Sequence, residues 1–164
     1  MSKYLTLTAL SLLSFFAPCF ATATPLTVTS SVTSRGALSL YDYTIINSGL
    51  PNLQSVTLTT PAQASAVQNL TAPSGYSAFF DAGIGLVDFV VNSSQFPIGS
   101  SVGGFTLESP FDLDAAPYSA LSLDANQNPV VTTGAVTPTP EPATLGLLAV
   151  SLLSVLSLKK AARK

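Results

Sequence analysis

Short stretches in which apolar and polar residues alternate fill the middle of the chain. In the clearest one, residues 37–46, Tyr41, Tyr43 and Ile45 fall on one side of an extended chain. Residues 55–60 alternate in the same way. Because the side chains of a strand point alternately to its two faces, a period of two predicts strands with one face buried.

Further stretches rich in β-branched and aromatic residues are bounded by Gly, Pro, Asn and Ser. Together these stretches predict strands at residues 26–32, 37–46, 55–60, 76–80, 85–91, 102–107, 119–123 and 130–136. Turn residues at 81–83 and 124–129 predict two hairpins, and Gly103-Gly104 predicts a bulge or bend. Residues 61–75 predict a loop, with one helical turn as the alternative.

The pattern as a whole predicts an all-β fold. The sequence shows no long amphipathic helix before the last apolar segment of the chain. Short strands separated by turns at this spacing favour a small antiparallel β-sandwich with an immunoglobulin-like or jelly-roll-like outline. The order of the strands is left open by the pattern.

The first 23 residues have the three parts of a secretory signal peptide. Lys3 gives a short positive start, residues 4–16 are mostly apolar, and Ala21 and Ala23 form a small-x-small cleavage site. We therefore expect signal peptidase to cut after Ala23.

The same segment admits two other interpretations. Left uncut, its apolar run would act as a membrane anchor. Cys19 would be lipidated in a lipoprotein, but Phe16-Ala17-Pro18 before it fit that pattern poorly, because a proline next to the acylated cysteine is unexpected.

A second apolar segment, residues 143–158, lies near the other end of the chain and contains no charge. As a helix it would be roughly 24 Å long, slightly less than the ~30 Å hydrocarbon core of a bilayer. Basic residues follow it and can extend to the lipid headgroups, preferring the cytoplasmic side. We therefore predict a transmembrane helix at 143–158 and a basic cytoplasmic tail at 159–164, with the charges Lys159, Lys160, Arg163 and Lys164.

Just before this segment stands Pro140-Glu141-Pro142. A Pro-Glu-Pro motif that directly adjoins an apolar segment, a basic tail and the chain end resembles the PEP-CTERM sorting signal of Gram-negative bacteria. The resemblance implies recognition by a membrane-embedded exosortase, which cuts at or near the motif and passes the protein to the cell surface or extracellular matrix. The alternative is a Pro-rich linker before an ordinary tail anchor.

These signals divide the chain into a signal peptide (1–23), a β-sandwich body (24–136), a Pro-rich linker with the motif (137–142), the helix and the tail. A body of this length suits one domain. It carries one positive charge, Arg35, against seven acids, a net charge of −6; the acids are Asp42, Asp81, Asp88, Glu108, Asp112, Asp114 and Asp124. Such a body is not expected to bind nucleic acid or anionic lipid.

The composition argues against several kinds of catalytic site. The chain has no histidine, and its single cysteine, Cys19, lies in the predicted signal peptide, so neither a Ser-His-Asp triad nor a His/Cys zinc site can form. Carboxylate pairs such as Asp81 with Asp88, or Glu108 with Asp112 or Asp114, remain, but a body with no Trp and one Arg lacks the usual sugar-binding equipment of a glycosidase. We expect no enzyme activity, no cofactor and no metal. Asp112 and Asp114 are expected to be solvated; the alternative is a Ca²⁺ site that they would form with Glu108 and loop carbonyls.

Asn69-Leu70-Thr71 and Asn92-Ser93-Ser94 match the N-glycosylation pattern, so Asn69 and Asn92 are candidate glycan sites. The aromatic residues of the body are expected in the core or on a sheet face instead of in a sugar-stacking site.

The sequence therefore predicts an exported, non-enzymatic protein of the cell envelope or extracellular matrix, structural or adhesive in biofilm or exopolysaccharide. Its partners would be signal peptidase, the exosortase, the membrane and exopolysaccharide. It would be anchored transiently in the inner membrane with its body in the periplasm. The alternative is a carbohydrate- or protein-binding β-sandwich that stays anchored by its tail.

Overall fold

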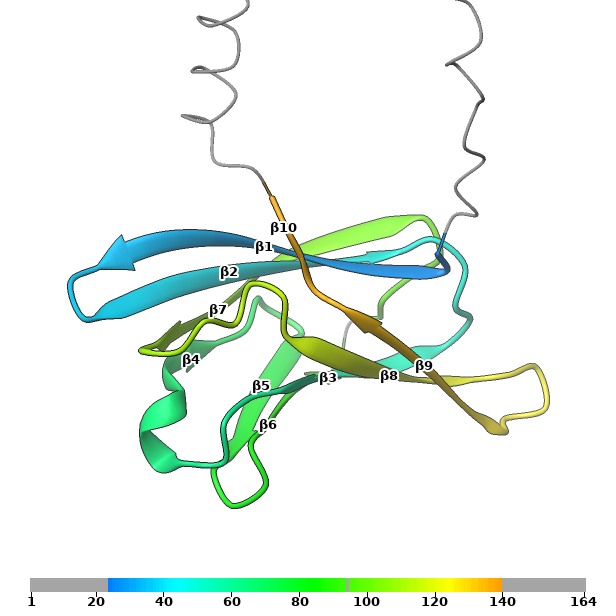
Figure 1. Ribbon diagram of the computed structural model, residues 1–164. Coiled ribbons are helices and arrows are strands. Elements are labelled where there is room, and N and C mark those ends of the chain that lie inside the picture. Colours follow the sequence, from blue (N-terminus) through cyan, green and yellow to red (C-terminus); the bar gives the residue numbers. More distant parts are fainter. Residues whose placement is uncertain (1–23, 94, 140–164) are drawn as a thin grey trace, which may run out of the picture.

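The computed structural model describes residues 24–93 and 95–139. Strands dominate this part of the chain and form two sheets, with one 3₁₀ turn, η1 (Ala64–Ala66), between them (Figure 1). The strands are β1 (Leu26–Arg35), β2 (Leu38–Asn47), β3 (Leu53–Thr59), β4 (Gln68–Thr71), β5 (Tyr76–Asp81), β6 (Leu86–Val91), β7 (Ser100–Ser109), β8 (Pro117–Leu123), β9 (Pro129–Ala135) and β10 (Thr137–Pro138).

Each sheet has five strands. Sheet A has the order β10-β1-β2-β7-β4, and sheet B has the order β5-β6-β3-β8-β9. Every neighbouring pair is antiparallel except β1 with β10, which is parallel. The predicted all-β class with antiparallel pairing is confirmed.

Aromatic residues from both sheets meet in one core. The rings of Phe89 on β6 and Phe105 on β7 have centroids 4.7 Å apart, and Tyr43 on β2 lies 5.9 Å from Phe89. Tyr41 and Ile45 are buried beside Tyr43, so the side of residues 37–46 that these three residues share is the face that packs inward. Burying a side chain of this size contributes about 1.5–3 kcal/mol, so the core side chains are the main source of stability in a body without disulfides.

Asn47 shows how a buried polar group is accommodated in this core. Its Nδ2 donates to the carbonyl oxygens of Leu50 at 2.8 Å and Phe96 at 2.7 Å. Its Oδ1 accepts from the backbone N–H of Leu50, also at 2.8 Å. Asn47 thereby fixes the predicted turn after β2 and ties it to the loop before β7, at little cost for burying an amide.

Both predicted hairpins are present, joining β5 to β6 and β8 to β9. The predicted irregularity at Gly103-Gly104 is also present: the register between β2 and β7 shifts between Tyr43 and Ile45, and Gly104 has a φ of 89°. Only glycine takes such a φ readily, so the bulge depends on Gly104.

Two short strands differ from the prediction. Residues 61–75, predicted as a loop, contain β4 and the helical turn that was the alternative, and Thr137–Pro138 form β10, inside the predicted linker. The predicted signal peptide and the helix at 143–158 lie outside the described residues. Within residues 24–93 and 95–139, no helix is long and apolar enough to cross a membrane.

Candidate functional site

The last described residues of the chain are fixed to the edge of sheet A. Val136 is buried, and its N–H donates to the carbonyl of Ala116 at 2.9 Å. Next, β10 pairs with β1 so that Thr137 lies beside Thr29. Beyond β10, Thr139 donates to the carbonyl oxygen of Ser30 from its backbone N–H and from its hydroxyl, both at 2.8 Å. The folded body thus extends to Thr139, directly before Pro140.

The β1 edge that receives β10 is itself held from inside the body. Ser30 is buried, and its hydroxyl donates to the carbonyl of Asp114 at 3.3 Å. Tyr118 on β8 donates its hydroxyl to the carbonyl of Leu26 at 2.9 Å, and burial raises the pKa of this phenol. Because both hydrogen bonds join β1 to other segments of the body, β10 docks on an edge that forms only when the body is folded.

The first described residues lie on the same strand. Residues 24 and 25 lead into β1 at Leu26, and the carbonyl of Pro25 accepts hydrogen bonds from the N–H groups of Ser48 and Gly49. Both ends of the described chain therefore leave the body from the β1/β10 edge, as Figure 1 shows. The predicted cleavage residues Ala21 and Ala23 precede this point and lie outside the described residues, as do Pro140, Glu141, Pro142 and the basic tail Lys159, Lys160, Arg163 and Lys164.

Both candidate glycan sites are exposed, and both amides are engaged. Asn69 has a left-handed φ of 49°, and its Nδ2 donates to Oε2 of Glu108 at 2.6 Å. Asn92 donates its Nδ2 to the hydroxyl of Ser77. An N-linked glycan would be attached to this nitrogen and would replace one of its two hydrogens, so a modified asparagine would have a single N–H left for the hydrogen bond seen here.

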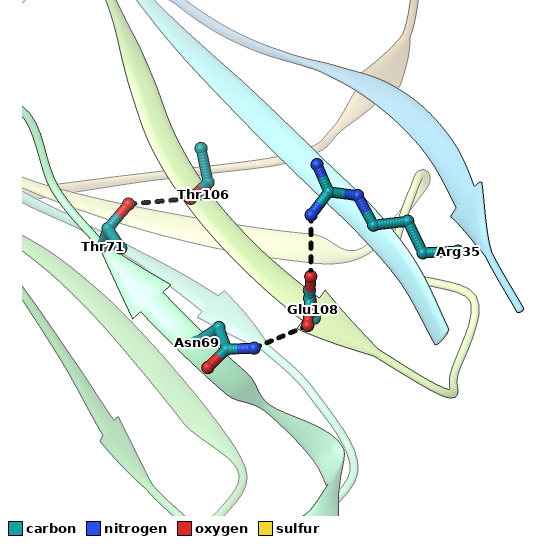
Figure 2. Close-up of polar contacts among 5 residues, drawn as sticks. All are labelled: Arg35, Asn69, Thr71, Thr106 and Glu108. Carbon is teal, nitrogen blue, oxygen red and sulfur yellow. Dashed lines mark hydrogen bonds and ion pairs between the residues drawn. The ribbon is translucent and has the colours of Figure 1, made fainter. Parts of the chain in front are cut away.

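The acids proposed as carboxylate pairs mostly have local partners. Glu108 accepts from Arg35 at 3.2 Å as well as from Asn69, so it links β1, β7 and β4 across the outer face of sheet A (Figure 2). Asp88 accepts from the hydroxyl of Thr57 at 2.5 Å, and Asp81 from the N–H of Gly83. These contacts stabilise strands and turns.

Asp112 and Asp114 lie in the loop between β7 and β8. The N–H of Asp114 donates to Oδ1 of Asp112 at 3.2 Å. The side-chain hydrogen bond with Asp112 also raises the pKa of Asp114, so the two carboxyls favour sharing a proton at low pH. Among the residues that the structure describes, no three acidic or sulfur ligands gather in a way that would hold a metal ion.

The C-terminal segment matches a known protein-sorting motif. Residues 138–164 match the family model for the PEP-CTERM protein-sorting motif. The chain carries a PEP-CTERM motif. The motif recognised in the sequence is thereby confirmed, and it implies an exported protein that is directed to an exosortase. Its first two residues, Pro138 and Thr139, are the residues held at the edge of sheet A.

Outside the PEP-CTERM motif the chain has few informative relatives. No curated protein sequence matches it. Among solved structures, it is similar to a GH20 exo-β-N-acetylglucosaminidase from Vibrio harveyi, with 12% identity, a TM-score of 0.43 and coverage of 71% of this chain but 18% of that one. It is also similar to the seventh ScaB type I cohesin from Pseudobacteroides cellulosolvens (13% identity, TM-score 0.36, 69% of this chain and 92% of that one). A third similar structure is the Fcho1 Mu homology domain of Danio rerio with bound Eps15 peptide. It has 13% identity, a TM-score of 0.39 and coverage of 70% of this chain and 46% of that one.

Proposed function

We propose that this chain is a non-enzymatic protein of the cell envelope or extracellular matrix, structural or adhesive in biofilm or exopolysaccharide, that reaches its place by exosortase sorting. The observation that carries the proposal is the PEP-CTERM match at residues 138–164, which begins on the last residues of the folded body. Signal peptidase would first remove residues 1–23 by cutting after Ala23. The helix at 143–158 and the tail at 159–164 would then hold the protein in the inner membrane with its body in the periplasm.

The docked position of β10 sets a constraint on sorting. Only three residues, 140–142, separate Thr139 from the predicted membrane helix at 143–158. Fully extended, the chain from Thr139 to residue 143 spans about 14 Å. This leaves little room for a membrane-embedded enzyme between the body and the bilayer. We therefore propose that residues 137–139 leave β1 when the exosortase binds Pro140-Glu141-Pro142, which adds about 10 Å of chain.

The motif is tested by replacing Glu141 or Pro142 with alanine in the full chain. Each variant is expected to remain uncut in the inner membrane. Asp81→Ala, which removes one exposed acid from a turn of the body, serves as the control and is expected to be processed normally. Release of the Glu141→Ala and Pro142→Ala variants at the rate of the unmodified protein would contradict the proposal.

The strand order favours the jelly-roll-like outline over the immunoglobulin-like one. β2 pairs with β7 while β3 pairs with β6, so the pairs are nested along the chain. An immunoglobulin-like sandwich instead pairs its second strand with its fifth and its third with its sixth, so its pairs are not nested. This nesting supports a jelly-roll-like body.

One groove supports the alternative function, a binding module. It has a volume of about 340 Å³ and lies between the β2–β3 turn and the β6–β7 loop. Its wall includes the amides of Asn52, Gln54 and Gln95, together with Ile98, whose side chain is exposed. Side-chain amides suit the hydroxyls of a sugar. Binding of the full chain on a glycan array, lost in Gln54→Ala but kept in Gln63→Ala, would favour this alternative.

A further inference from the structure

The two sheets have four edges, and three of them are protected against pairing with another chain. β10 has two residues and contains Pro138. β4 is short and loses its register at Asn69. β5 has β4 of the other sheet beside it and ends in Asp81. Short strands, proline, irregularities and charges are the usual means by which proteins prevent edge pairing.

β9 forms the fourth edge; it lies beside β1 of the other sheet, but it is neither short nor charged. Within the described residues, β9 has a hydrogen-bonded neighbour, β8, on one side only. It has seven residues, its only proline is the first, and residues 125–139 contain no charge. Figure 1 shows the β8–β9 hairpin extending past the rest of sheet B. A long uncharged edge is a template for another strand.

The hydrogen-bond pattern of the β8–β9 hairpin shows which N–H and carbonyl groups of β9 are not bonded to β8. The N–H of Asp124 donates to the carbonyl of Asn128 at 2.9 Å at the start of the hairpin. In an antiparallel ladder, hydrogen-bonded pairs alternate with pairs that are not bonded. Because Leu121 faces Val131 and Ser119 faces Thr133 in the register, Val131 and Thr133 fall at the positions that are not bonded to β8. Their N–H and carbonyl groups therefore point away from β8.

The side chains of this edge are also unusually apolar for a surface. Val131 is 64% exposed and lies beside Leu121, which is 36% exposed, on the outer face of sheet B. Val130 is 41% exposed on the opposite face of the hairpin. A strand with free backbone groups and apolar side chains on both faces has the chemistry of an unoccupied strand-pairing site.

We propose that this site pairs with β9 of a second copy of the same chain. Two antiparallel copies of β9 related by a two-fold axis at Thr132 place Val131 of each copy opposite Thr133 of the other, so each residue's free N–H and carbonyl meet a partner. The body carries a net charge of −6, yet its acids lie outside residues 125–139, so the pairing brings no like charges face to face. The two five-stranded sheets B become one continuous sheet.

The register is limited from both ends of β9. Pro129 has no N–H to donate. Towards its other end, residues 132–135 line a groove that is shared with Pro25 and Thr27 at the start of β1, and the strand leads into the buried Val136. Between these limits Val131 and Thr133 are the residues whose N–H and carbonyl groups point away from β8, which places the two-fold axis at Thr132.

A cysteine introduced at the axis tests this arrangement directly. The only cysteine of the natural chain, Cys19, precedes the body. In the proposed dimer the two copies of residue 132 form a non-bonded pair with Cα atoms about 4.5 Å apart, within the range of a disulfide. The full chain with Thr132→Cys, purified from membranes in detergent, is expected to form a disulfide-linked dimer under mild oxidation. Thr133→Cys is the matched control, since residue 133 faces residue 131 of the other copy, and it is expected to stay largely uncrosslinked.

The mass of the full chain in detergent provides a second readout. The natural chain is expected to be a dimer, and Val131→Lys is expected to shift it to a monomer whose β-rich circular dichroism spectrum shows that it is still folded. Thr33→Lys, on the exposed end of β1, is the control and is expected to remain a dimer. A natural chain that is monomeric, a dimer that survives Val131→Lys, or equal crosslinking of the residue 132 and 133 variants would each overturn the proposal.

Discussion

Thr139 is bound to Ser30 through both its backbone N–H and its hydroxyl, each at 2.8 Å, although the two residues lie 109 positions apart in the chain. Ser30 is the fifth of the ten residues of the first strand, and Thr139 is the last residue before the Pro-Glu-Pro motif. Two hydrogen bonds of this kind contribute about 1–3 kcal/mol together. The start of the sorting motif is therefore joined to the folded body by contacts weak enough to break during processing.

A disulfide between β1 and β10 should prevent processing. Thr29 and Thr137 are register partners, so Thr29→Cys with Thr137→Cys places two cysteines side by side, and the exported body has no other cysteine to compete. The oxidised double variant is expected to accumulate uncut in the membrane fraction, because residues 137–139 can no longer leave β1. Western blots of membrane and medium fractions measure this.

Each single cysteine variant is the control for that experiment and is expected to be processed. Addition of a reductant should restore processing of the double variant. Normal processing of a double variant whose disulfide is shown on a non-reducing gel would rule out the release of β10.

Gly134 should be intolerant of a side chain. A Cβ at this position would lie 2.6 Å from the ring of Tyr118, which is buried and bonded to Leu26. Gly134→Ala is expected to lower the free energy of unfolding by about 1–3 kcal/mol because the ring must shift. Gly49→Ala, where the nearest atom is at 3.7 Å, is the control and should change stability little. Urea unfolding measures both, and equal stability of the two variants would contradict the packing at Gly134.

Two phenylalanines of sheet B differ in burial and should therefore differ in their contribution to stability. Phe89 is fully buried between Tyr43 and Phe105, whereas Phe79 is 58% exposed on β5. Phe89→Ala is expected to lower the free energy of unfolding by about 3–5 kcal/mol, because it leaves a cavity. Phe79→Ala is expected to cost less than about 1 kcal/mol. Chemical unfolding of both variants checks this ordering, and a larger loss from Phe79→Ala would show that the core is placed wrongly.

Asp124 should make the β8–β9 hairpin sensitive to acid. Its Oδ1 accepts from the N–H groups of Asn126 and Asn128, both at 2.8 Å. The hydrogen bond from the Asn128 backbone is the main cause that lowers the pKa of Asp124 below its ordinary value of 3.8, and the Asn128 side chain adds to it. A carboxyl with a lowered pKa in the folded state stabilises fully above the unfolded-state pKa, and this contribution is lost as the pH falls through the folded-state value.

The measurement is the unfolding midpoint of the natural body and of Asp124→Ala from pH 7 to pH 2. The natural protein is expected to be more stable near neutral pH, and the difference is expected to shrink below about pH 4. A difference that stays constant over the whole range would show that the carboxylate contributes no charge-dependent stability.

The alternation of apolar and polar residues was sufficient to predict most of the fold. The grouping of Tyr41, Tyr43 and Ile45 on one side of β2 was predicted correctly because alternation is a local property of a strand, and the structure adds that this side is the buried one. β4 was missed because it is four residues long and is interrupted by the left-handed Asn69, so it never shows a full period. Its partner, β7, lies far along the chain, and pairing over that distance leaves no local signal.

At the sorting site, too, the part with a local sequence signal was predicted, and the part that depends on distant residues was not. The sorting motif was recognised from Pro140-Glu141-Pro142 and the residues after it, and the family match confirms it. The docking of β10 was not predicted, since Pro138 argues against a strand in a sheet interior and is tolerated here at an edge. The exposed β9 edge also required the structure, because its uncharged sequence alone does not show that one side lacks a neighbour.

The intact mass of the protein recovered from its native envelope or culture medium tests the central claim most directly. The account predicts a product that begins at Thr24 and ends at or near Pro140-Glu141-Pro142, without residues 143–164, with any additional mass reporting a glycan or an attached molecule. A product that still carries residues 143–164 would contradict exosortase sorting and would leave a permanently tail-anchored protein.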